Sequence, residues 1–470
     1  MIFRKKVCAL KPFINKLFVY SLLTFILVYF LSVIWKLSLV DILLSSSGLV
    51  MLVSALILLP KQNLKLPFTL IVFSLLILYV TSASPIVLWN GLREMSAVVP
   101  LIVLVSLVSW MIGHRPYVIA LMTKMNRYIT SSTRFFTLVA GTSHIISSFM
   151  AVGGVPFVYQ MFRNTKRDSV SQNAWDFTIS TAIMRGFTLT VLWATVHPAF
   201  VYAVAGTDAP LMATVLKGIG LTGLGFMTGI LLFRLQMKKN DIPDTVMPNL
   251  HFKEQEPEKG LVGKFFFWIF VLMGGIFLSI QWLKLDILLA VPVVIMMVTT
   301  LYFFVNKEMS TYKQRFRKLI TIDFENKKKE MVLILSAGLL VGTLKETGYG
   351  HVLFAYFLSA IDFVNINILI GLTLVVIVLG FCGFPPIPAM ILLSGILVDI
   401  PGGYSTDVIA LSLLLGVSVT LVTAPVTVPL LLISSQNGRS LAENGIGWNL
   451  GFGVLFLLIG LAYIQLLTIF

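Results

Sequence analysis

The uncharged run 135-FFTLVAGTSHIISSFMAVGGVPFVYQMF-162 determines the membrane topology predicted for this chain. Basic residues flank it on both sides: Lys124, Arg127 and Arg134 before it, and Arg163, Lys166 and Arg167 after it. Because basic loops of membrane proteins face the cytoplasm, both ends of the run belong on the same side. Gly153, Gly154 and Pro156 allow a turn in its middle. The sequence therefore predicts a re-entrant helical hairpin; the alternative is one kinked transmembrane helix.

The composition places the whole chain in a bilayer. Its 470 residues are 57% hydrophobic and 12% charged, and the mean hydropathy is +0.95. Soluble domains are roughly a quarter charged. Apolar runs of about 20 residues, each long enough to cross the hydrocarbon core as a helix, recur along the sequence. The expected fold class is an all-α polytopic membrane protein.

Several function classes are disfavoured. The net charge of +15 resides in short loops between apolar runs, which makes it a topology signal and not a nucleic-acid footprint. The two cysteines, Cys8 and Cys382, lie in unlike surroundings and predict neither a disulfide nor a metal site. There is no catalytic triad or metal-ligand spacing, so we expect no enzyme and no cofactor, apart from Na⁺ as a coupling ion.

About eleven spans follow from the apolar runs, with the N-terminus cytoplasmic and the C-terminus outside a bacterial or archaeal plasma membrane. They are 17–35, 39–60, 67–84, 95–113, 175–197, 211–234, 265–282, 286–305, 331–346, 407–435 and 448–469. The run 363–398 lies between Asp362 and Asp399. It is broken by Gly380, Gly383, Pro385, Pro386 and Pro388. We interpret it as a second hairpin, entering from outside.

The order of elements then repeats. Residues 95–234 give a span, a connector near 116–131, a hairpin and two spans. Residues 331–469 give the same series with a connector near 351–361. The first series starts outside and the second inside, which is an inverted-topology repeat with its site between the halves.

Backbone N–H and C=O groups at a helix break inside a membrane need hydrogen-bond partners from protein or from a water-filled cavity. The helix breaks therefore indicate the position of the site. The candidate substrate-binding residues are Ser147, Ser148, Gly153, Gly154, Arg185, Gly383, Pro385 and Thr423. The candidate cation-binding residues are Ser147, Thr181, Cys382, Thr420 and Thr427. Free N–H groups at helix breaks suit an anion, and hydroxyl and carbonyl oxygens suit Na⁺. The alternative is that the hydroxyls bond their own helices.

Two ionisable residues lie in this region. Arg185 is the only fully charged residue between Asp176 and Asp208. A buried arginine without a carboxylate nearby has a bound anion as its natural partner, the alternative being a structural arginine bonded to backbone carbonyls. His144, inside the first hairpin, is a candidate proton site or a neutral hydrogen-bonded histidine.

The layout resembles the ion transporter superfamily, in particular the divalent anion/sodium symporter family and its relatives. The Ser-Asn-Thr signature of its dicarboxylate members is replaced here by Ser147-Ser148 and by Cys382-Gly383, so the resemblance lies in topology. It implies a dimerising scaffold and a mobile transport domain. The implied parts are 1–132 and 265–362 as scaffold, 133–234 and 363–470 as transport-domain halves, and 235–264 as a linker.

The resulting hypothesis is a secondary active transporter of a small, carboxylate-like organic anion. It would be coupled to Na⁺ or H⁺ and work as a homodimer by elevator-like alternating access. The alternative is a transporter or flippase of a phosphorylated lipid carrier, with Arg185 facing phosphate. The expected partners are the anionic substrate, the lipid bilayer and a second copy of the chain, and no nucleic acid.

Overall fold

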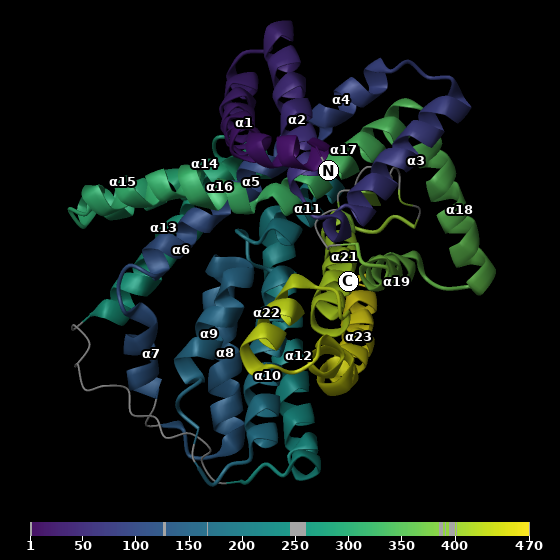
Figure 1. The fold of residues 1–470 in the computed structure, drawn as a ribbon. Helices are drawn as coiled ribbons and strands as arrows, with labels where there is room; N and C mark the ends of the chain where they lie inside the picture. The colour runs from purple at the N-terminus through teal and green to yellow at the C-terminus, as the bar shows by residue number, and fades with distance from the viewer. Residues whose placement is uncertain are drawn as a thin grey trace. The chain divides into compact units, whose positions relative to one another are not determined.

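The computed structural model describes residues 2–125, 128–166, 168–244, 260–384, 389–390, 392–393, 400 and 402–469. Their secondary structure is helical (Figure 1). Among these residues, nine helices are long and apolar enough to cross a membrane, or ten if one bent pair counts as a span. The predicted class, an all-α polytopic membrane protein, is confirmed.

The chain forms two compact units. Unit 1 comprises Met1–Leu104, Thr300–Val364 and Ile391–Asp399. Unit 2 comprises Val105–Thr299, Asn365–Met390 and Ile400–Phe470. Contacts define these units but assign no movement to either, so the roles of scaffold and transport domain stay predictions.

Unit 1 is built around α17, which packs against α2, α3 and α4. Its helices are α1 (Ile2–Ile34), α2 (Ser38–Leu58), η1 (Lys61–Asn63), α3 (Lys65–Thr81), α4 (Ile86–Glu94), α5 (Val98–Leu104), α15 (Met309–Lys318), η7 (Leu319–Asp323), α16 (Phe324–Asn326), α17 (Lys328–Glu346) and α18 (Tyr349–Val364). Two ion pairs, Arg93–Asp41 at 2.7 Å and Lys345–Glu94, join α2 and α17 to α4. Because α18 turns away from α17 by 89°, the two cannot form one straight span.

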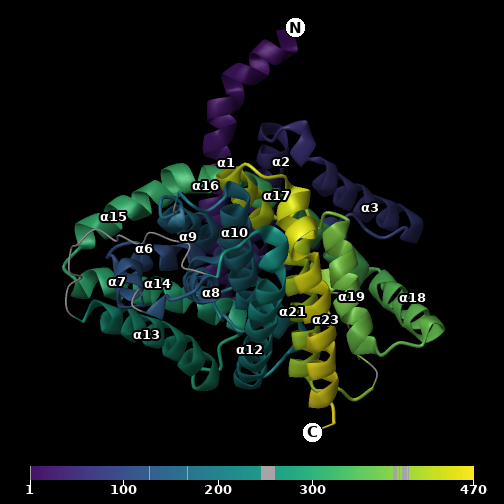
Figure 2. The same ribbon diagram turned by 90° about the horizontal axis from the view of Figure 1, so that it is seen from below.

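Unit 2 contains the first predicted hairpin, residues 365–390 of the second and the broken spans. Its helices are η2 (Val105–Leu107), α6 (Val108–Ile112), α7 (Tyr117–Met125), α8 (Ser132–Met150), η4 (Ala151–Gly153), α9 (Gly154–Phe162), α10 (Gln172–Thr188), η5 (Leu189–Leu192), α11 (Pro198–Thr207), α12 (Leu211–Gln236), η6 (Lys238–Asn240), α13 (Leu261–Gln281), most of α14 (Ile287–Val305), α19 (Ile368–Phe381), α21 (Thr406–Thr423), α22 (Val428–Asn437), η8 (Glu443–Gly447) and α23 (Trp448–Leu467). Its core is α10 and α21, which are buried on all sides. Figures 1 and 2 show α21 lying beside α19 and α23.

Three predicted spans do not qualify by themselves on length and composition. The segment 331–346 forms α17, which qualifies only together with α18 across their 89° bend. The segment 67–84 forms α3, which has 17 residues and falls short of the roughly 20 that a straight span needs. The segment 175–197 forms α10, η5 and an irregular stretch. Its hydroxyl-bearing and charged side chains lower its hydropathy, although all of its helical residues from Ala174 onward are buried in protein.

The chain reverses within 135–162, as predicted. Helix α8 ends at Met150, and Ala151 takes a left-handed φ of 47°. A Cβ built on Gly154 would lie 2.9 Å from the Cα of Ser147. Residues seven apart in a continuous helix are separated by about 10 Å. Thus α9 folds back against α8 although the run is long enough to be one span.

The first arm of the second hairpin lies within the described residues, and its return arm lies mostly outside them. Helix α19 ends at Phe381, and Gly383 adopts a φ of 91°. The N–H of Phe384 donates to the carbonyl of Leu379 at 3.0 Å, a helix-ending bond that requires the left-handed residue. Pro385 lies outside the described residues, and of the predicted return arm only 389–390 and 392–393 lie within them.

Candidate functional site

Two broken helices cross unit 2, and their breaks match in detail. After η5, the chain is irregular from Trp193 until α11 starts at Pro198. After α21, it is irregular until α22 starts at Val428. Each second half has ten residues and a proline in its first turn, where the missing N–H costs no helical bond. Each ends on a left-handed residue, Asp208 or Gly438.

A constant spacing of 230 residues relates the two breaks. It links Thr188 to Ser418, which are hydrogen-bonded to each other. The same spacing links the residues at the two N-cap positions, His197 and Thr427, of which only His197 caps its helix with its side chain. In sequence, 186-GFTLTVLWATV-196 aligns with 416-GVSVTLVTAPV-426 without a gap. The predicted repeat is therefore visible in this segment as matched helix ends and as a weak internal alignment.

The glycines that begin these matched segments let each broken helix approach its hairpin. A Cβ on Gly186 would lie 2.9 Å from the backbone carbonyl carbon of Ala140 in α8. A Cβ on Gly416 would lie 2.6 Å from the carbonyl oxygen of Thr373 in α19. Such distances exclude any side chain without backbone movement. Each hairpin thus contacts the broken helix that follows it along the chain.

The first hairpin holds Ser147, a residue predicted for both substrate and cation. Its side chain is completely buried, and its Oγ has no hydrogen-bond partner among the described residues. Ser148, next to it, donates to the carbonyl of His144 at 2.8 Å. Gly154 lies against Ser147, whereas Gly153 faces open space.

The second broken helix holds an equivalent case. Thr420 is 1% exposed, and within the part of the chain that the structure describes its Oγ1 also has no partner. Its side chain contacts α19 at Gly380, where no Cβ would fit. Ser147 and Thr420 were both predicted as cation ligands from residue type and position. Buried polar atoms without protein partners are rare in native proteins, and binding of an ion is one recognised reason for them.

The hydroxyls of three other predicted residues donate to nearby backbone carbonyls, as in the alternative that such groups bond their own helices. Thr181 donates to the carbonyl of Phe177 at 2.6 Å. Thr423 donates to Val419 at 2.6 Å and Thr427 to Leu421 at 3.2 Å. Each oxygen keeps lone pairs after this donation, so binding of a cation stays a prediction.

The sites predicted at the second hairpin tip are less well defined. Cys382 is a free, exposed cysteine, and Gly383 supplies the left-handed turn. Within the described residues, no three His, Cys, Asp or Glu side chains form a metal-binding group. A cation held here would therefore have hydroxyl and carbonyl oxygens as its ligands.

Arg185 is satisfied by protein groups. Its Nε donates to Asn449 Oδ1 at 3.0 Å and its Nη1 to the Gly229 carbonyl at 3.2 Å. Its Nη2 donates to Gln236 Oε1 at 3.0 Å and to the Trp448 carbonyl at 3.2 Å. The guanidinium also lies over the rings of Phe136 and Phe452. Four neutral acceptors bind four of the five guanidinium N–H donors that a bound anion was expected to use, as in the structural alternative.

His144 is likewise held in one form. The indole N–H of Trp193 donates to His144 Nε2 at 2.9 Å. His144 Nδ1 lies 3.0 Å from the carbonyl oxygen of Gly186. An indole nitrogen can only donate and a carbonyl can only accept, so the ring is the neutral Nδ1–H tautomer. This arrangement leaves no site for an added proton on His144, and it corresponds to the neutral alternative.

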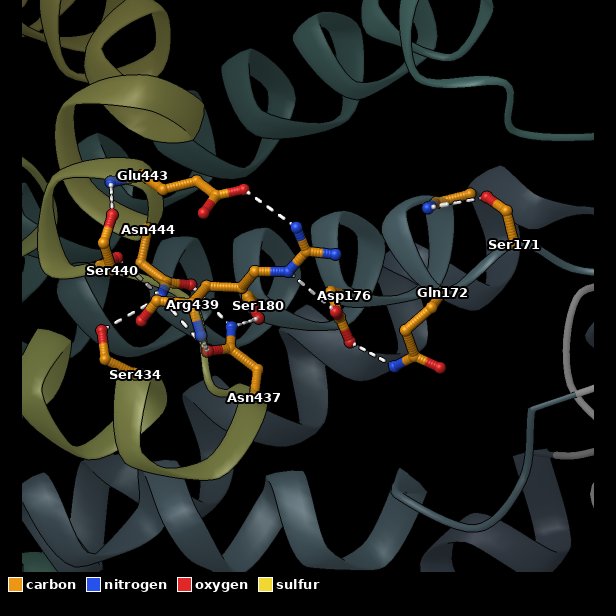
Figure 3. A network of polar contacts seen from close by, with 11 residues as sticks. Ser171, Gln172, Asp176, Ser180, Ser434, Asn437, Arg439, Ser440, Glu443 and Asn444 are labelled. Atoms are coloured by element: carbon orange, nitrogen blue, oxygen red, sulfur yellow. Dashed lines mark hydrogen bonds and ion pairs between the residues drawn. The ribbon is translucent and has the colours of Figure 1, made fainter.

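Sequence reasoning missed a polar network at the start of α10 (Figure 3). Asp176, which is 2% exposed, accepts from Arg439 Nε at 3.1 Å and from Gln172 Nε2 at 2.7 Å. Arg439 also pairs with Glu443 at 3.3 Å. Asn444 is fully buried and bonds to Asn437, whose amide reaches Ser180 at 2.9 Å.

A second buried ion pair mirrors the first. Asp407, 3% exposed at the start of α21, pairs with Lys217 at 2.6 Å. Each broken helix thus begins with a buried aspartate whose partner follows the second half-helix of the other repeat: Arg439 follows α22, and Lys217 follows α11. The sequence shows an acid and a base at comparable places in each repeat, and this was the only indication of the two ion pairs. One sequence does not show which acid pairs with which base.

The geometry defines a helical membrane protein with a first helical hairpin and two broken helices related by an internal repeat. No family model and no curated sequence matches the chain. Two solved structures share its fold. The YdaH transporter of Alcanivorax borkumensis matches with a TM-score of 0.57 and 14% identity, over 86% of this chain and 98% of that one. MtrF of Neisseria gonorrhoeae matches with a TM-score of 0.51 and 15% identity, over 86% and 94%.

These likenesses concern the fold. YdaH is described as a transporter with an unusual topology. The structure of MtrF is described as informative about a class of antimetabolite efflux pumps. The resemblance to the divalent anion/sodium symporter family stays a prediction.

Proposed function

We propose that this protein is a secondary active transporter of a small organic anion, working by elevator-like alternating access as a homodimer. The observation that carries the proposal is the pair of matched helix breaks in the interior of unit 2. A transporter needs backbone groups that can bind solute within the membrane, and helix breaks supply them. The start of α22, which has no side-chain cap, offers N–H groups to an anion, whereas His197 caps the N–H of Ala199 at the start of α11.

The two unpartnered hydroxyls support a coupling cation. Ser147 Oγ and Thr420 Oγ1 are buried oxygens of the kind that Na⁺ prefers. His144, the candidate proton carrier, is neutral and bonded at both nitrogens. We therefore favour Na⁺ over H⁺ as the coupling ion.

The shared fold adds support for the transport class. YdaH and MtrF are both named as transport proteins, and each is covered almost fully by this chain. The proposal does not include a direction of transport, because efflux is stated for the class of pumps to which MtrF relates and not for this chain.

Uptake into proteoliposomes tests the proposal. Radiolabelled acetate, succinate and citrate would be offered under an inward Na⁺ gradient, under a pH gradient and under neither. We expect accumulation of at least one anion with the Na⁺ gradient alone. An anion that binds the purified protein but crosses at the same rate under all three conditions would refute coupling.

Hydroxyl variants test the cation site. Ser147→Ala and Thr420→Val each remove an unpartnered oxygen, so the Na⁺ concentration for half-maximal uptake should rise about tenfold, the loss of roughly one ligand. Ser148→Ala is the matched control, since its hydroxyl already bonds the His144 carbonyl. Equal Na⁺ dependence in all three variants would remove Ser147 and Thr420 from the site.

A further inference from the structure

A polar cavity lies in unit 2, at the opposite end of α9 from the hairpin turn. It has a volume of about 280 Å³ and is lined by the end of α9, residues 163–166 that follow it, the start of α10 and the end of α22. With nine residues, α9 separates it from the turn by about 13 Å. It is therefore not the site between the helix breaks.

The cavity is lined by cations and amides and by no acid. Arg163 and Lys166 come from the segment after α9, and Gln172 and Asn437, both labelled in Figure 3, come from α10 and α22. The acid on α10, Asp176, does not line the cavity, and its carboxylate accepts from Arg439 and Gln172. Arg163 and Lys166 are the charged residues of the lining.

The two cations have donors to spare. Lys166 gives one ammonium hydrogen to the carbonyl of Val170 at 2.8 Å, which leaves two. Within the described residues, no carboxylate is paired with Arg163 or Lys166. Two like charges three residues apart in one loop repel each other, and a bound anion would remove that cost.

The helix that begins beside them adds to the same potential. Ser171 caps α10 by accepting from the N–H of Ala174. The N–H groups of the first helical residues, Gln172 and Asn173, have no intrahelical acceptor. The 17-residue α10 therefore presents the positive end of its dipole toward a cavity that already holds two cations.

The cavity is also the right size for one small group. Sites for drug-sized ligands occupy roughly 300–1,000 Å³, and this cavity lies just below that range. Tyr159 and Trp175, which are nearly buried, form its apolar wall. A guanidinium, an ammonium and a helix start are the donors that recognise a phosphate group.

We propose that this cavity binds a phosphate group, which either a phospholipid headgroup or a soluble phosphate can supply. Arg163 would give a bidentate contact, and Lys166 would add its point charge. The inference does not depend on transport, so its tests measure binding alone.

Two binding experiments on the full-length purified protein separate the sources. The first follows the apparent unfolding temperature in detergent as sodium phosphate replaces sodium chloride at constant ionic strength. The second uses native mass spectrometry to count retained dioleoylphosphatidylglycerol against dioleoylphosphatidylcholine. Stabilisation by phosphate identifies a soluble ligand, and selective retention of the anionic lipid identifies a headgroup; either supports the proposal.

Variants tie the binding to this cavity. We expect Arg163→Gln and Lys166→Gln each to weaken binding about tenfold and the double variant about a hundredfold, because each removes a charge-assisted contact. Arg134→Gln is the matched control, an exposed arginine of α8 that bonds Thr130 and does not line the cavity. Binding that is undetectable for both probes, or that is unchanged in the double variant, would overturn the proposal.

Discussion

Thr188 and Ser418 exchange hydrogen bonds in the core of unit 2: the hydroxyl of each donates to the backbone carbonyl of the other. The Ser418 hydroxyl reaches the Thr188 carbonyl at 3.0 Å, and the two hydroxyl oxygens are 3.2 Å apart. The residues hold the same place in the two repeats. A position that contacts its own equivalent lies on a two-fold axis, so the pseudo-symmetry axis of the repeat passes between them.

Removing this exchange should loosen the junction of α10 and α21. We expect Thr188→Val and Ser418→Ala each to lower the free energy of unfolding by about 1 kcal/mol, the net value of a buried hydrogen bond. Because the two hydroxyls also contact each other, the double variant should lose less than the sum. Chemical denaturation in detergent micelles measures this. Thr190→Val, whose hydroxyl bonds within its own helix, is the control, and additive losses would contradict the reciprocal contact.

The chain reversal was predictable because loop charge is a local signal. Basic residues on both sides of 135–162 require both ends to face one compartment, and this needs no tertiary information. Ser147 and Thr420, whose hydroxyls are unpartnered, were predicted as candidate ligands from local information too, namely their residue type and their position near a break.

The partners of Arg185 were not predictable from one sequence. A buried arginine signals a need for acceptors, but Asn449 lies 264 residues away and is neutral. Because no carboxylate lies near Arg185 in the sequence, a bound anion was predicted as its partner. Similarly, the separation of Asp176 from Arg439 is 263 residues, so only the repeat would have suggested that acids in one half pair with bases in the other.

Gly154 should be irreplaceable in the first hairpin. A methyl group there would meet the backbone and side chain of Ser147, so Gly154→Ala should cost about 1–3 kcal/mol through overpacking. Gly153→Ala is a matched control next to it, since nothing lies within 4 Å of its Cβ and its φ is −63°. Thermal denaturation in detergent compares the two. Equal losses would mean that α9 does not pack on α8 as described.

The network around Asp176 should respond unequally to its two neutral substitutions. Arg439→Gln leaves a nearly buried carboxylate with only Gln172 as its partner, and we expect a loss of about 3–5 kcal/mol. Asp176→Asn leaves an arginine whose side chain is 29% exposed and still faces Glu443, so its cost should be smaller. Denaturant titration of both variants gives the comparison. A larger loss for Asp176→Asn would show that the carboxylate has access to water.

His197 should be replaceable by a residue that caps a helix. Its Nδ1 accepts from the N–H of Ala199 at the start of α11, so His197→Ala should cost about 1 kcal/mol. His197→Asn supplies an equivalent acceptor and should retain most of the stability. His197→Thr imitates the second break, where Thr427 occupies this position. If all three variants unfold at the same denaturant concentration, the cap contributes nothing.

Arg185 separates a structural role from a substrate contact. Its side chain joins α10 to α12 and α23 through four hydrogen bonds, so Arg185→Gln should cost about 2–4 kcal/mol by stranding buried acceptors. Asn449→Ala removes one of those acceptors without touching the guanidinium. If the arginine is structural, the two substitutions are non-additive and neither changes the KM for the transported anion in proteoliposomes. A KM raised by Arg185→Gln but not by Asn449→Ala would instead place the guanidinium on the substrate. The occupied donors lead us to expect the first result.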